Sequence, residues 1–163
     1  MTPAASKRTR IDDFLARLSS LYEDVKSWLP DKSLKTQTKP LKLTEELFGS
    51  YTAQSLEIEG PINREIATLR PIGAGILGAL GRADLVGTRG SQVIVYLAKG
   101  GPQIRFSYKN AAGKEFDRRQ RAMLQGVEKE GWYWIEDRRL GRARPLDKQL
   151  FCDLLREVSD YEP

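Results

Sequence analysis

The sequence of 163 residues contains no histidine and only one cysteine, Cys152. These two deficits exclude Ser–His and Cys–His catalysis, zinc sites ligated by histidine and any disulfide within the chain. Cys152 falls within the apolar register of the last predicted helix, so we interpret it as a packing residue rather than as a nucleophile. The sequence also has no Walker loop and no nucleophile elbow. We therefore expect a non-catalytic protein with no cofactor and no metal site.

Long hydrophobic runs are missing as well. No stretch approaches the roughly 18 apolar residues that a membrane span needs, and the first ten residues lack the apolar segment of a secretory signal. We expect a cytoplasmic protein that does not associate with a membrane. Hydrophobic residues make up 40% of the chain and charged residues 30%, which are ordinary values for a globular protein.

Charge is distributed unevenly along the chain. Lys and Arg number 27 against 22 Asp and Glu, giving a formal net charge of +5. Residues 1–10 and 31–42 each carry +3 and residues 105–145 carry +5, whereas residues 146–163 carry −3. Such asymmetry favours a polyanionic partner, although the solvated faces of soluble proteins are also often locally of one sign.

Residues 11–30 are predicted to form an amphipathic helix, because apolar residues recur at helical spacing until Pro30 ends the pattern. This stripe suits docking onto a globular surface, either the chain's own domain or a protein partner, and we assign it as a partner-docking helix. Residues 1–10 are expected to be a basic flexible tail, and residues 31–42 a basic linker. The docking stripe comprises Ile11, Phe14, Leu18, Leu21, Val25 and Trp28.

Residues 43–163 are expected to form a single α+β domain. Short apolar runs with period two, bounded by Gly, Pro, Asn and Lys, predict six short strands at 55–59, 65–69, 81–86, 92–98, 103–108 and 131–136. Thr44 as N-cap and Gly49 as terminator predict a short helix at 43–48, and helical spacing predicts another over 116–129 and a final one over 146–158. The expected fold is an N-terminal amphipathic helix, an antiparallel meander or partial barrel of about six short strands, and a C-terminal helix.

Residues 73–78 match the dinucleotide-binding pattern G-x-G-x-x-G. The required context is missing, because no adequate helix follows and no acidic residue lies at the position that would bind a ribose. We interpret the glycines as a bent strand or tight turn with close backbone packing.

Residues 81–99 resemble the central hairpin of the PD-(D/E)xK nuclease family, with Asp84 and Lys99 at matching positions. The resemblance implies a divalent metal held by Asp84 and by a carboxylate two residues before the lysine. That second position is Leu97, and a hydrocarbon cannot bind Mg²⁺. A degenerate or divergent metal-dependent nuclease is therefore an alternative hypothesis.

Residues 131–145 combine aromatic residues with four arginines. Aromatic rings and guanidinium planes stack on bases, and Arg binds phosphate in a fork geometry, so the segment favours nucleic-acid binding. We hypothesise a non-catalytic accessory or adaptor subunit that binds nucleic acid or a nucleoprotein assembly. The alternative is a protein–protein module, an inhibitor or scaffold subunit, whose arginines meet an acidic protein surface. The predicted binding residues are Arg138, Arg139, Arg142, Arg144, Arg118, Arg119, Arg121 and Trp132.

Overall fold

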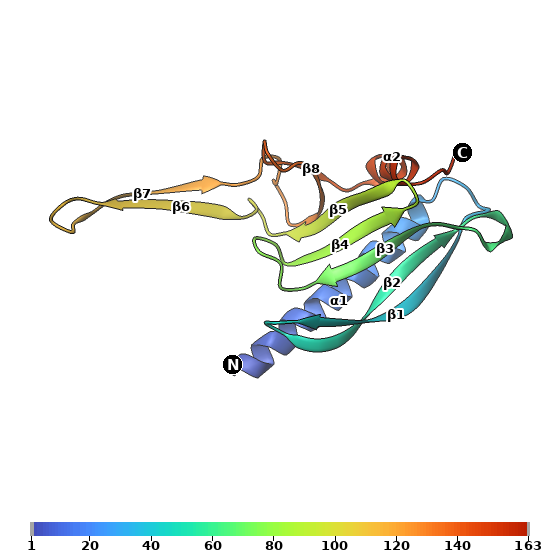
Figure 1. Cartoon of the computed structure of the whole chain (residues 1–163), viewed down its shortest axis with the longest axis horizontal. Coiled ribbons are helices and arrows are strands. Elements are labelled where there is room, and N and C mark those ends of the chain that lie inside the picture. Colours follow the sequence, from blue (N-terminus) through green and yellow to red (C-terminus); the bar gives the residue numbers. More distant parts are fainter. Residues whose placement is uncertain (1, 163) are drawn as a thin grey trace.

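The fold is a layer of two helices on one face of an open antiparallel sheet (Figure 1). This computed structural model describes residues 2–162, and within that range it describes only the backbone at residues 105–108 and 115–120. The helices are α1 (Pro3–Trp28) and α2 (Lys148–Val158). The predicted α+β class is confirmed, and the sheet is open rather than closed into a barrel. No described helix is both long enough and apolar enough to cross a membrane.

Seven strands within residues 2–162 form the main sheet, and every neighbouring pair is antiparallel. A second sheet has two strands, which lie in the sequence between the fifth and sixth strands of the main sheet. The main sheet runs in the order β1 (Lys35–Glu45), β2 (Gly49–Glu59), β3 (Glu65–Gly73), β4 (Gly81–Gly87), β5 (Gly90–Leu97), β8 (Gly131–Asp137), β9 (Arg142–Pro145). The small sheet pairs β6 (Gln103–Lys109) with β7 (Glu115–Ala122).

Helix α1 begins at Pro3, so the flexible tail predicted for residues 1–10 is wrong for residues 3–10. The side chain of Thr2 accepts a hydrogen bond from the backbone N–H of Ala5, which caps the helix. Pro3 suits the first turn, because backbone N–H groups there make no hydrogen bond within the helix and the N–H that proline lacks is not needed. The Lys and Arg residues that follow are good helix formers, and their charge alone indicated a tail.

The apolar stripe of α1 is buried against the chain's own sheet. Phe14 and Val25 are fully buried, and Ile11, Leu18 and Leu21 are nearly so. An open sheet has an apolar face that another element must cover, and α1 and α2 together cover it. Of the two alternatives, the stripe therefore docks onto its own domain, and its assignment to a protein partner is corrected.

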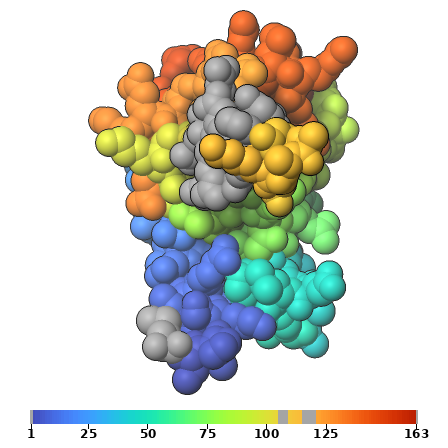
Figure 2. Space-filling view, turned by 90° about the vertical axis from the view of Figure 1, so that its left-hand side faces the viewer, coloured from blue at the N-terminus to red at the C-terminus, as the bar shows by residue number. Residues whose placement is uncertain are grey.

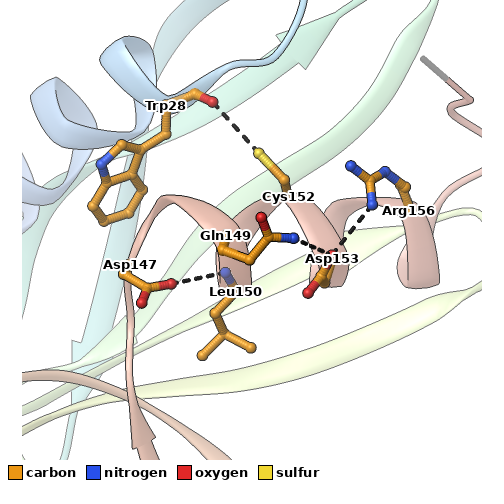
Figure 3. A network of polar contacts seen from close by, with 7 residues as sticks. All are labelled: Trp28, Asp147, Gln149, Leu150, Cys152, Asp153 and Arg156. Atoms are coloured by element: carbon orange, nitrogen blue, oxygen red, sulfur yellow. Dashed lines mark hydrogen bonds and ion pairs between the residues drawn. The ribbon is translucent and has the colours of Figure 1, made fainter.

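Helix α2 completes the same layer beside the end of α1. Asp147 caps α2 by accepting a hydrogen bond from the Leu150 N–H at 2.8 Å, and the thiol of Cys152 lies 3.5 Å from the carbonyl oxygen of Trp28 (Figure 3). Trp28 also packs against Phe151, with ring centroids 6.0 Å apart. Burial raises the pKa of the Cys152 thiol, in keeping with a packing role.

Three local predictions differ from the structure. The linker predicted for residues 31–42 is largely strand β1, which pairs with β2 along its full length. The helix predicted at 43–48 is the end of β1 and the turn into β2, and that predicted over 116–129 is β7 and the loop after it. β1 misled the prediction because it is an edge strand, where Lys residues and Pro40 protect the free edge instead of marking a loop.

Candidate nucleic-acid interface

Residues 103–122 form a two-stranded ribbon that projects away from the main sheet (Figure 1), and we call it the β6–β7 arm. The arm has six basic and two acidic residues, a formal net charge of +4. Its register runs from Gln103 opposite Ala122 at the base to Lys109 opposite Glu115 near the tip. At the base, the Met123 N–H donates a hydrogen bond to the Pro102 oxygen at 2.9 Å, so the two ends of the arm are joined.

The turn between β8 and β9 packs against the segment that follows the arm. The Gln125 N–H donates to the Gly141 oxygen at 2.6 Å, and the Ala143 N–H donates to the Gln125 oxygen at 3.0 Å. Gly141 has a φ of +65°, and a Cβ there would lie 2.4 Å from the Met123 oxygen, so only glycine allows this approach. These contacts place the β8–β9 turn at the foot of the arm.

These contacts bring arginines that are distant in sequence to the foot of the arm. Arg121 belongs to the end of β7, Arg138 and Arg139 to the β8–β9 turn, and Arg142 forms an isolated bridge with Gln125. We call these four residues, Arg121, Arg138, Arg139 and Arg142, the basic end. All four are exposed.

The carboxylates among the described side chains leave the arginines of the basic end without an ion pair. The nearest acid in sequence, Asp137, is instead used by the turn itself, accepting hydrogen bonds from the backbone N–H groups of Arg139 and Leu140 at 2.8 and 3.0 Å. The positive charge of the basic end is thus available to an external anion.

Two of the predicted binding residues contact aromatic side chains of the sheet. The indole N–H of Trp132 donates to the Arg17 oxygen at 3.3 Å, and its ring meets Tyr96 edge-on at 5.3 Å. Trp132 therefore packs between the sheet and α1, whereas the sequence placed it among the binding residues. Arg144 is exposed on β9, and its guanidinium lies over the Trp134 ring, 5.8 Å from the ring centroid.

Arg118 and Arg119 are also predicted binding residues, and their side chains lie outside the described residues. Their backbone belongs to β7, where Arg119 stands opposite Phe106. The backbone thus assigns both residues to the arm.

An apolar hollow of about 320 Å³ adjoins the basic end on the sheet face opposite the helices. Val93, Val95 and Ile135 line it from the sheet, and Met123 lines it from the foot of the arm. Arg138 reaches this hollow from the β8–β9 turn. The second, smaller core cluster of the protein lies here, which fixes the segment after β7 onto the sheet.

The hairpin that resembles a nuclease is formed by β4 and β5, but its acidic residue is already paired. Asp84 accepts two hydrogen bonds from the guanidinium of Arg82, at 2.8 and 2.9 Å, and this carboxylate raises the pKa of Arg82. Leu97, at the position of the missing carboxylate, is a buried core residue. Among the described residues, no group of three or more His, Cys, Asp or Glu side chains is placed to hold a metal ion.

The glycine motif at 73–78 forms the connection from β3 towards β4, where the tip of the β1–β2 hairpin clamps it. The Glu45 carboxylate accepts hydrogen bonds from the N–H groups of Ala74 and Gly75 at 3.1 and 2.8 Å, and from the Tyr51 hydroxyl. A Cβ on Gly73 would lie 2.6 Å from the Glu45 side chain. Close packing therefore accounts for the glycine, as the sequence interpretation expected.

Protein-family models, curated proteins and solved structures were each compared with the chain, and none of the three gives a match. Sequence reasoning found the arginines of the basic end but missed the arm as a projecting element, because residues 116–122 were assigned to a helix. The turn signal at residues 110–113 between two charged segments was the available clue.

Proposed function

We propose that the protein is a non-catalytic accessory protein that binds nucleic acid through the β6–β7 arm and the basic end. The observation that carries the proposal is the position of these two elements. The four exposed arginines of the basic end, which form no ion pair within the described side chains, lie at the foot of a projecting ribbon whose sequence, Arg121 included, carries a net charge of +4. A polyanion that contacts the arm therefore also meets the basic end.

The distribution of charge over the whole molecule also favours binding of a polyanion on the side of the arm. Figure 2 looks at the side from which the arm projects, and the beginning of α1, which includes Lys7, Arg8 and Arg10, lies on that side. The acidic segment 146–162 comprises α2 and its flanks, which lie away from the arm (Figure 1). A lopsided charge of this kind steers a polyanion towards the positive side.

Binding through phosphate contacts is sensitive to salt, because each neutralised phosphate releases condensed counterions. For about four phosphate contacts, the affinity falls roughly a hundredfold between 50 and 200 mM salt. An acidic protein partner lacks the regular charge density of nucleic acid, so the same titration distinguishes the two hypotheses.

The test is fluorescence anisotropy with labelled DNA and RNA across that range of salt. We expect measurable affinity at the low end and a steep decline. The double variant Arg138→Glu, Arg139→Glu should weaken binding and flatten the salt dependence by about two phosphate contacts. The matched control is Lys32→Glu, Lys35→Glu, which makes the same charge change at exposed residues after α1 and should bind more tightly than the arginine variant.

Two outcomes would contradict the proposal. One is the absence of binding to any nucleic acid at the lowest salt concentration, which would favour the protein–protein alternative. The other is an equal loss of affinity in the arginine variant and in the lysine control, since that would show a dependence on total charge instead of on the basic end.

A further inference from the structure

We infer that the β6–β7 arm enters the major groove of a B-form DNA duplex. This inference rests on the proposed function and specifies its ligand. The arm is a two-stranded antiparallel ribbon that pairs with no strand of the main sheet and extends beyond it (Figure 1). Its shape and its charge together select among the forms of nucleic acid.

The width of the ribbon fits one groove better than the others. Paired strands lie about 4.8 Å apart, and side chains on both edges widen the ribbon further. The major groove of B-form DNA is about 12 Å wide and admits a two-stranded ribbon, whereas the minor groove is about 6 Å wide. The major groove of an A-form RNA duplex is too narrow and deep for side chains to reach the bases.

The length and register of the arm fit the same groove. Its strands have 7 and 8 residues, which at about 3.3 Å per residue make the arm roughly 25 Å long, enough to reach past several base pairs. The register puts Arg105 opposite Gln120, and Gln103 lies two residues from Arg105 on the same strand. Guanidinium and amide groups are the two that form paired hydrogen bonds with guanine and adenine in this groove.

The basic end supplies the complementary contacts outside the groove. Arg138, Arg139 and Arg142 lie at the foot of the arm, where the backbones that border an occupied groove would pass. Contacts to phosphate fix the position of a protein on a duplex, and contacts to base edges provide selectivity. The arrangement thus divides the two tasks between the foot of the arm and the arm itself.

The decisive variant replaces residues 103–122 with Asn-Gly. Pro102 and Met123 are already joined by a hydrogen bond across the foot of the arm, and a two-residue turn preserves that bond. The point variant Arg105→Ala retains the arm and provides the test if the arm-replaced protein does not fold. Lys32→Ala is its control. Both are compared with the unaltered protein on a DNA duplex, on an RNA duplex of the same sequence and on the single DNA strand.

We expect the DNA duplex to bind most tightly and the protein to protect guanine N7, which faces the major groove, from methylation. The arm replacement should abolish this protection, and Arg105→Ala should lower duplex affinity about tenfold, as expected for a lost contact between Arg and guanine. Equal or tighter binding of the RNA duplex or of the single strand would overturn the inference. Bound duplex with unprotected N7 would overturn it too. In both cases the proposed function would stand, whereas a failure to bind any of the three ligands would reject the proposed function itself.

Discussion

The body of the protein and the β6–β7 arm are both built from antiparallel strands, but they are stabilised differently. Strands in the body bury residues against α1 and α2 on one face and, near the foot of the arm, against a smaller cluster on the other. The arm pairs only within itself, and an isolated two-stranded hairpin is at best marginally stable in water. Burial therefore constrains the sequence of the body, while the sequence of the arm is free to carry charge. The proposed function would therefore place base contacts in a part of the chain that adds little to the stability of the body.

The largest effect on stability is expected in the body from Phe14→Ala. Phe14 is fully buried between α1 and the sheet, and Gly81 leaves room for its ring, since a Cβ there would lie 2.5 Å from a ring carbon. Removing the ring should lower the free energy of unfolding by about 3–5 kcal/mol. Urea unfolding measures this change. Leu77→Ala, at a fully exposed residue, is the control and should change the free energy by less than about 0.5 kcal/mol. Similar losses in the two variants would show that α1 does not complete the core.

A smaller loss of stability is expected from Gly87→Ala at the end of β4. A Cβ on Gly87 would lie 2.2 Å from the Val158 oxygen, so α2 would have to move away from the sheet. Overpacking of this kind costs about 1–3 kcal/mol, and thermal or urea unfolding should detect it. Gly131→Ala is the matched control on β8, because nothing lies within 4 Å of its added Cβ. A neutral Gly87→Ala variant would contradict the close packing of α2 on β4.

A pH-dependent effect is expected from the buried hydroxyl of Tyr22, which donates a hydrogen bond to the Gln54 oxygen. Burial raises the pKa of Tyr22 above its ordinary value of about 10. The protonated Tyr22 hydroxyl therefore makes its full contribution to the free energy of unfolding below pH 10. As the pH rises further this contribution is lost, by about 1.4 kcal/mol at pH 11. Unfolding measured at pH 8 and pH 11 should show a smaller difference in Tyr22→Phe than in the unaltered protein. An equal difference in both proteins would exclude this role for Tyr22.

Much of the body could be predicted from the sequence because its signals are local. The spacing of Phe14, Leu18 and Val25 predicted α1, and the alternation in 81–97 predicted the β4–β5 hairpin. The helix predicted over 116–129 failed because apolar residues that share helical spacing serve different elements. Leu124 and Val127 pack in the small cluster on the sheet face opposite the helices, whereas Phe116 belongs to β7.

The candidate site could be predicted only in part. Arg138, Arg139 and Arg142 were predicted from the sequence as binding residues, and all three are exposed. Their position at the foot of the arm depends on hydrogen bonds between Gln125 and the Gly141 and Ala143 backbone. No local pattern encodes such contacts between distant segments.

The most direct test of the account measures stability and binding on the same arm-replaced protein, with Asn-Gly in place of residues 103–122. Urea unfolding gives the free energy of the body, and anisotropy at 50 mM salt gives the affinity for a DNA duplex. The account predicts a free energy of unfolding within about 0.5 kcal/mol of the unaltered protein, as for changes outside the core, together with a loss of affinity of at least about tenfold. A folded variant that binds the duplex as tightly as the unaltered protein would contradict the account.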